Sequence, residues 1–410
     1  MTPRLGLVDK LLPVWIFAAM GLGLLLAVFI PSFGELLHSW SIGSVSVPIA
    51  LGLLVMMYPV LAKVRYSNAK AVAADRRLLV ASLALNWIVG PALMFALAWI
   101  FLADLPEYRT GLIIVGLARC IAMVLIWNDL ACGDREAAAF LVAINSVFQV
   151  VAFAGLGWFY LQVLPSWLGL PTTSAEFSFL AITASVLVFL GLPLAAGYLS
   201  RRIGEARRGI DWYENTFLPR VGPFALWGLL FTIVMLFALQ GNQVIANPVD
   251  VGRIALPMLV YFLVIFVFGF VVGKLIGLAY ERTATLAFTA AGNNFELAIA
   301  VAIGTFGAAS GQALTGIVGP LIEVPVLVGL VYVSLWLRKR MFPAIRLSSA
   351  AGSARTGGTG RGESPAGAGA VSVAGAVAVP DPHSAPAPDP DPATGSPSDS
   401  SGKVAAPSAQ

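Results

Sequence analysis

Apolar stretches of about 20 residues follow one another along roughly the first 340 positions of the chain, separated by short polar segments. An α-helix rises about 1.5 Å per residue, so crossing a hydrocarbon core about 30 Å thick takes roughly 20 residues. With 58% hydrophobic and 11% charged residues, the chain has too little polar surface for a water-soluble globule of this size. We therefore predict an all-α polytopic membrane protein whose ten transmembrane helices span residues 11–30, 45–61, 78–102, 111–131, 137–161, 177–199, 221–239, 254–273, 283–305 and 314–337.

Basic residues flank these predicted helices unevenly. With the N-terminus inside, 19 Lys and Arg residues fall on the cytoplasmic side, and only Arg109 and Arg253 fall outside. Flanking Lys and Arg resist translocation, so we expect a multi-pass protein of the cell (inner) membrane with both termini in the cytoplasm. The membrane orientation then explains the net charge of +4, and no nucleic-acid partner is expected. The first stretch is too long for a signal peptide, and we expect it to be retained.

Ten helices can divide into two halves of five, and an odd number per half forces the halves into opposite orientations. A run beginning at Pro48 resembles one beginning at Pro223, although such residues are common in any bilayer helix. From about Ser348 the chain turns to Ala, Gly, Pro and Ser, which cannot bury enough surface to fold. The predicted organisation is a cytoplasmic N-terminus (1–10), a first five-helix repeat (11–161), an extracytoplasmic linker (162–176), a second repeat (177–337), and a cytoplasmic basic stop with a disordered tail (338–410).

Four ionisable residues lie inside predicted helices, where a charge costs roughly 2.5 to 3.5 kcal/mol on insertion scales. They are Arg119, Asp129, Glu296 and Glu323. Arg119 is either a structural cation that pairs with Glu296 or Glu323, or a direct substrate contact. Asp129 is expected near the membrane interface. Glu323 is either a second proton site or a partner of the kinks that its flanking prolines introduce.

Amide side chains occur in pairs in two of the predicted helices, the ninth and the fifth. Gly292, Asn293 and Asn294 precede Glu296, a composition typical of a membrane helix that unwinds and replaces lost backbone bonds with side-chain bonds. In the fifth helix, Asn145 and Gln149 are four residues apart and share one face. These amides are candidates for lining the same cavity, and their alternative role is to bond neighbouring helices.

Cys120 directly follows the buried cation Arg119, and a neighbouring guanidinium favours the thiolate that soft, thiophilic centres bind. The alternative is an inert packing residue. Cys132 lies in a polar turn, and no role is expected for it. The two cysteines do not form a disulfide framework. The sequence holds no phosphate-binding loop, His-x-x-x-His pair or nucleophile elbow, which disfavours an enzyme, a cofactor, a resident metal and ATP-driven pumping.

The run from Gly116 to Ala131, which contains Arg119 and Cys120, strongly resembles the fourth-helix signature of the arsenical-resistance arsenite permeases. These permeases belong to the bile acid/sodium symporter-like superfamily. The run from Gly292 to Ala300 resembles their ninth-helix signature, and the likeness covers about residues 5 to 345. It implies two inverted five-helix repeats with broken, crossing helices four and nine. It also implies that Cys120 and Glu296 are essential for transport. Cys132 and the long tail depart from the family pattern.

The resemblance implies export of arsenite, often with antimonite, in exchange for protons. We expect Cys120 to give a transient sulfur contact to arsenic(III), Arg119, Asn145, Gln149, Asn293 and Asn294 to line the substrate site, and Glu296 and Glu323 to carry the returning proton. No ATPase partner is expected. Two alternatives remain: a sodium-coupled organic-anion symporter of the same superfamily, and a membrane scaffold or sensor whose tail recruits a partner.

Overall fold

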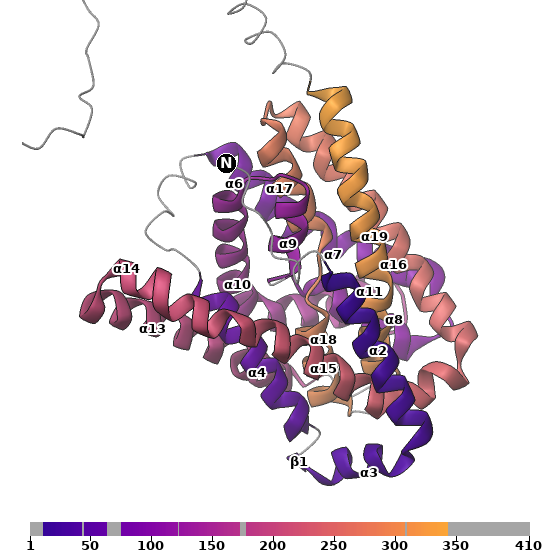
Figure 1. The fold of residues 1–410 in the computed structure, drawn as a ribbon. Helices are drawn as coiled ribbons and strands as arrows, with labels where there is room; N and C mark the ends of the chain where they lie inside the picture. Colours follow the sequence, from indigo (N-terminus) through magenta and orange to yellow (C-terminus); the bar gives the residue numbers. More distant parts are fainter. Residues whose placement is uncertain are drawn as a thin grey trace, which may run out of the picture. The chain divides into compact units, whose positions relative to one another are not determined.

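A computed structural model describes residues 11–42, 45–63, 75–121, 123–172, 178–307 and 310–342. Apart from a two-stranded antiparallel hairpin and one isolated bridge, the regular structure in these ranges is helical (Figure 1). The predicted N-terminal segment 1–10 and nearly all of the tail 338–410 lie outside the described residues.

The elements follow the predicted apolar stretches in order. They are α2 (Leu12–Phe29), α3 (Pro31–Ser39), β1 (Ser41–Ile42), β2 (Val45–Ser46), α4 (Val47–Ala62), α6 (Arg76–Ala84), η2 (Leu85–Val89), α7 (Gly90–Phe101), α8 (Pro106–Leu117), α9 (Met123–Leu130), α10 (Arg135–Trp158), η3 (Phe159–Val163), α11 (Leu164–Trp167), α12 (Phe179–Val186), η4 (Leu187–Gly191), α13 (Leu192–Arg208), α14 (Ile210–Trp212), η5 (Tyr213–Phe217), α15 (Leu218–Ala246), α16 (Pro248–Leu275), α17 (Tyr280–Ala291), α18 (Phe295–Phe306) and α19 (Gly311–Met341).

Seven helical runs among the described residues are long and apolar enough to cross a bilayer: Leu12–Phe29, Arg76–Phe101, Arg135–Trp167, Phe179–Arg208, Ile210–Ala246, Pro248–Leu275 and Gly311–Met341. The second predicted segment corresponds to the shorter apolar helix α4. The fourth and ninth correspond to the pairs α8–α9 and α17–α18, each interrupted by a few non-helical residues. The polytopic all-helical architecture is confirmed, as is the predicted unwinding of the ninth helix.

Four long runs contain a π-helical turn, and each turn lies just before a proline. The turns η2, η3, η4 and η5 end two residues before Pro91, Pro165, Pro193 and Pro219. A proline has no N–H to donate, and its ring clashes with the carbonyl four residues earlier. Widening the preceding turn by one residue relieves that clash while the helix continues. The chain therefore crosses these prolines as uninterrupted helical runs.

Several helices begin at a polar residue whose side chain accepts from a backbone N–H three residues on. Asp75 caps α6, Asp134 caps α10, Ser178 caps α12 and Ser310 caps α19. Such caps satisfy N–H groups that the first helical turn leaves unpaired. They explain why the polar turns between apolar stretches mark helix starts.

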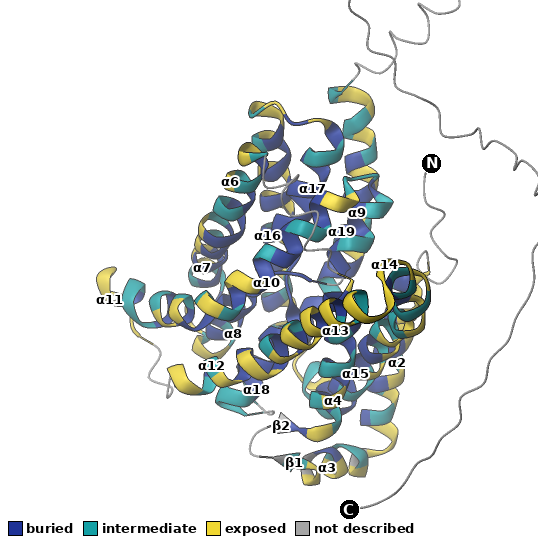
Figure 2. Cartoon of the chain, turned by 90° about the vertical axis from the view of Figure 1, so that its left-hand side faces the viewer, coloured by how far each residue is buried: buried dark blue, intermediate teal, exposed yellow. Residues whose placement is uncertain are grey.

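Two groups of helices pack tightly among themselves. Helices α2 and α4 pack on α15, and α13 packs on α4, whereas α16, α17, α18, α19, α7 and α8 form the other group. Figure 2 shows the first group gathered around the α15 label, away from α6 and α7. Gly228 of α15 allows the close approach to α4, because a Cβ there would lie 2.7 Å from the Met56 backbone nitrogen. Many large apolar side chains are exposed on the outer helices, including Val151 at 80% and Trp227 at 67%. Such a surface matches a lipid environment.

Candidate transport site

The interruptions in the fourth and ninth helices lie against each other in the interior. Arg119 and Asn293 pair across them as an isolated antiparallel bridge. The Cys120 N–H donates to the Gly292 carbonyl at 3.2 Å, and the Asn294 N–H donates to the Ala118 carbonyl at 3.0 Å. Each break therefore satisfies backbone groups of the other, as non-helical backbone buried at membrane depth must.

Side chains from two further helices complete this arrangement. The Arg119 N–H donates to Oε1 of Gln149 on α10, and the Asn293 N–H donates to Oε1 of Glu323 on α19 at 3.3 Å. In each bond the donor and acceptor are 30 residues apart in the chain. Asn293 also follows Arg119 by as many residues as Glu323 follows Gln149. The two breaks are thus held in equivalent ways, one by an amide and the other by a carboxyl.

Local sequence explains the geometry of the ninth-helix break. Gly292 meets the other break so closely that a Cβ there would lie 2.8 Å from the Cβ of Cys120, a distance that only glycine avoids. Asn294 then starts α18 as its N-cap, because its Oδ1 accepts from the Leu297 N–H at 3.0 Å. Glycine and asparagine therefore end one helix and begin the next within three residues.

The guanidinium of Arg119 is directed toward α16 and the end of α17. It donates to the Tyr261 hydroxyl at 2.8 Å, to the Ala290 carbonyl at 3.4 Å, and to the Gly116 carbonyl. Among the described residues Arg119 forms no ion pair with Glu296 or Glu323, so the pairing alternative was wrong. Neutral oxygens of Tyr261, Ala290 and Gly116 stabilise the guanidinium instead.

Several buried polar atoms at the meeting point lack a hydrogen-bond partner: both side-chain atoms of Asn293, Nδ2 of Asn294, Nε2 of Gln149 and Oε2 of Glu323. Asn293 and Glu323 are fully buried, at 0% exposure. Buried polar atoms are rarely left unpaired, because each costs about 1–3 kcal/mol. The cluster offers donors and acceptors to a small polar solute, and within the described residues no three His, Cys, Asp or Glu side chains are grouped to hold a metal ion.

The predicted thiol and the two predicted carboxyls share this region. Cys120 is 5% exposed, and its Sγ and the Glu323 Oε1 both lie near Gly292. Glu296, in the first turn of α18, is only partly buried. It lies two residues after the N-cap Asn294, where the chain leaves the ninth-helix break. The structure thus groups Cys120, Gln149, Asn293, Asn294, Glu296 and Glu323.

Other candidate residues have separate contacts. The Asn145 Oδ1 accepts from the Trp87 indole N–H at 3.1 Å, so this amide bonds η2 instead of the breaks. Asp129, in the last turn of α9, forms an ion pair with Arg135, which lies beyond that helix. Cys132 is half-buried in the turn after α9. A role for Tyr261, whose hydroxyl accepts from the Arg119 guanidinium, was not predicted from the sequence. Its hydroxyl in the middle of an apolar stretch was the signal that could have revealed it.

The sequence matches a known family and several known proteins. The Sodium Bile acid symporter family model matches residues 50–247. The chain is 62% identical over 340 residues to the Arsenical-resistance protein Acr3 of Corynebacterium glutamicum, covering 83% of this chain and 92% of that protein. It is 35% identical over 346 residues to an uncharacterized transporter of Synechocystis (80% and 88%), and 30% identical over 340 residues to the Arsenical-resistance protein Acr3 of Alkaliphilus metalliredigens (80% and 93%).

The fold and its paired helix breaks, with the family match, define a multi-pass membrane transporter related to the sodium bile acid symporters. The match at 62% identity over 340 residues narrows this class of transporter to one family. The chain belongs to the Acr3 arsenical-resistance family.

Proposed function

We propose that the chain is a secondary active exporter of arsenite that exchanges its substrate for protons and so confers arsenic resistance. Two relatives named arsenical-resistance proteins, matched over most of both chains, support this assignment. The observation that carries it is the buried, unpartnered side-chain amide of Asn293, at the paired breaks that also hold Cys120 and Glu323.

Arsenous acid is neutral near pH 7 and offers three hydroxyl groups and a soft arsenic centre. The Asn293 amide can donate to one hydroxyl and accept from another, and the Asn294 and Gln149 amides add donors. Sulfur is the side-chain atom that a soft centre prefers, so Cys120 supplies a transient contact. A single thiol suits a carrier, since a site with three thiolates would hold arsenic too tightly for release.

Proton exchange requires a group that can bind a proton when the substrate leaves. Glu296 is the first candidate, because it is partly accessible and lies two residues after Asn294, at the ninth-helix break. Glu323 is the second, because one oxygen holds the Asn293 N–H and the other lacks a partner. Each charge that crosses 100 mV contributes about 2.3 kcal/mol, so an entering proton can drive export of a neutral solute.

We also propose that the two halves are inverted five-helix repeats, with both termini in the cytoplasm. The equivalent bonds at the two breaks support the repeat, as does the recurrence of a broken helix followed by a long helix in each half. The excess of Lys and Arg on one side supports the orientation. Cysteine labelling of substitutions placed in successive loops tests the proposed sidedness.

The decisive experiment is arsenite uptake by everted membrane vesicles under imposed gradients. In these vesicles export appears as uptake. We expect a proton gradient with an acidic vesicle interior to drive this uptake, and we expect a sodium gradient not to drive it. Uptake that follows sodium and ignores the proton gradient would favour the sodium-coupled organic-anion symporter instead. No uptake under either gradient, from protein that is correctly inserted, would remove the transport assignment.

A further inference from the structure

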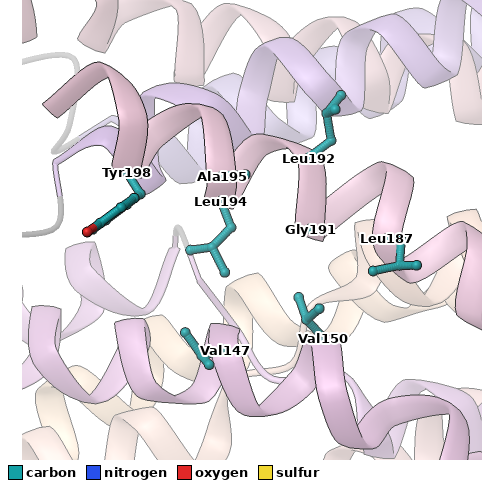
Figure 3. A pocket seen from close by; sticks show the side chains of 8 residues that line it. All are labelled: Val147, Val150, Leu187, Gly191, Leu192, Leu194, Ala195 and Tyr198. Atoms are coloured by element: carbon teal, nitrogen blue, oxygen red, sulfur yellow. The ribbon is translucent and has the colours of Figure 1, made fainter. Parts of the chain in front are cut away.

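An apolar groove of about 660 Å³ opens between α10 and the continuous run formed by η4 and α13. Val147 and Val150 line it from α10, and Leu187, Leu192 and Leu194 line it from the opposite run (Figure 3). The two walls meet where η4 contacts α10, but α13 also packs on α4 whereas α10 also packs on α17. The groove therefore follows a seam between helices, and Val150 on its α10 wall is next in the chain to Gln149, which bonds the fourth-helix break.

Small residues keep this groove open. Gly191 and Ala195 line it one helical turn apart, next to the π-helical turn that precedes Pro193. A Cβ at Gly191 would make ordinary van der Waals contacts, with the nearest atoms of Leu187 and Val150 at 3.4 and 3.9 Å, so larger side chains there would extend into the groove. The only polar side chain in the lining is that of Tyr198. These apolar walls favour a hydrocarbon ligand.

The length of the groove matches one leaflet of a bilayer. Along the helical run from Leu187 to Tyr198 the rise is about 16 Å at about 1.5 Å per residue. Half of a hydrocarbon core of about 30 Å is about 15 Å. A hydrocarbon chain that lies along this run therefore reaches from the bilayer centre to the headgroup region.

A cation stands at the Tyr198 end of the groove. The exposed Arg202 donates through Nη1 to the Tyr198 hydroxyl at 3.1 Å. Its neighbour Arg201 is occupied by Glu205 and Glu214, at 2.6 and 2.9 Å. A phosphate at the headgroup level can therefore bond the Arg202 guanidinium and the Tyr198 hydroxyl together, a pairing that the planar guanidinium favours.

We propose that this groove binds one acyl chain of an anionic phospholipid from the leaflet on the basic side of α13, with the lipid phosphate held by Arg202 and Tyr198. The bound lipid fills the seam between α10 and α13. The proposal does not rest on arsenite export: Val147 and Val150 line the groove, whereas Gln149 between them is fully buried and bonds the fourth-helix break.

The test uses the full chain purified in neutral detergent, with native mass spectrometry to measure retained phosphatidylglycerol and phosphatidylcholine. We expect one phosphatidylglycerol per chain to be held in preference to phosphatidylcholine. Arg202→Gln should weaken phosphatidylglycerol binding roughly fivefold, as expected for one basic residue at an anionic surface. Ala195→Phe, which places a ring in the groove, should abolish retention of both lipids.

Two matched variants control for general effects. Arg207→Gln removes another exposed cation of α13, and Ala196→Phe adds a ring at the exposed neighbouring position outside the lining, and both should bind lipid as the unmodified chain does. If Ala195→Phe does not remain monodisperse, Gly191→Leu fills the same space. Normal lipid retention by a folded groove-filling variant would overturn the site. Equal binding of the two lipids, unaffected by Arg202→Gln, would overturn the phosphate contact.

Discussion

Gln149 and Glu323 stabilise the two helix breaks in the same way, because each accepts a hydrogen bond from a backbone N–H through Oε1. The two side chains have nearly the same shape, but only Glu323 can change its charge. Its remaining oxygen lacks a partner, as does the Gln149 amide nitrogen. A pair of near-identical contacts with one ionisable member allows protonation to act on one break and not on the other.

Cys120→Ser should abolish arsenite transport. The hydroxyl keeps nearly the same size, but oxygen is a hard ligand and loses the soft contact to arsenic. Cys132→Ser should leave transport nearly intact, because Cys132 lies in the turn after α9. Arsenite uptake by everted vesicles, normalised to inserted protein, measures both variants. Equal activity of the two would refute the thiol contact.

Glu296→Gln should remain folded, because the amide keeps the size of the side chain, and should lose transport driven by a proton gradient. Glu296→Asp should keep partial function, because the carboxyl remains although it is one methylene shorter. Vesicle uptake against the arsenite gradient separates these outcomes. If Glu296→Gln exports at the unmodified rate, proton coupling must be assigned elsewhere, and Glu323 is the next candidate.

At the scale of elements, the two kinds of helix irregularity have different origins. The π-helical turns are local, since each precedes a proline that the sequence displays. The break between α17 and α18 is also visible locally, in Gly292 and the Asn294 cap. The break between α8 and α9 has no proline, and its residues alone did not predict it. That break is stabilised by Gln149 and by the opposite break, which are distant in the chain.

Gly292→Ala should force the two breaks apart, because its Cβ would lie 2.8 Å from the Cβ of Cys120. Such overpacking costs about 1–3 kcal/mol, so we expect a lower melting temperature together with a large loss of arsenite uptake. The matched control is Gly329→Ala in α19, where an added Cβ meets nothing within 4 Å. A Gly292→Ala protein as stable and active as the control would contradict the requirement for contact between the breaks.

For the whole molecule, the exposed apolar helices and the buried polar centre follow from a lipid solvent. The outer surface contacts hydrocarbon, so polar groups are retained only where they bond one another or a solute. Arg338, at the end of α19, contacts Glu281 at 3.2 Å and lies over the Tyr280 ring. Tertiary contacts therefore stabilise even the last turn of α19.

Ending the chain after Ser348 should preserve transport, because the Ala-, Gly-, Pro- and Ser-rich composition beyond it offers little apolar surface to pack on the helices. Ending it after Leu337 should lower stability, because this also removes Arg338 and its contacts with Glu281 and Tyr280. Membrane insertion and vesicle uptake compare the two proteins. Loss of transport by a normally inserted chain ending at Ser348 would assign the tail a role.

The sequence by itself determined the apolar helices, their order, the broken ninth helix and the identity of the buried thiol, amides and carboxyls. These features depend on hydropathy and on neighbours within a turn or two. Only the tertiary structure decided that Arg119 bonds Tyr261 instead of a carboxylate, that Asn145 bonds Trp87, and that the two breaks pair. The physical reason is that a buried polar group must find a partner wherever packing brings one, and those partners lie far away in the chain.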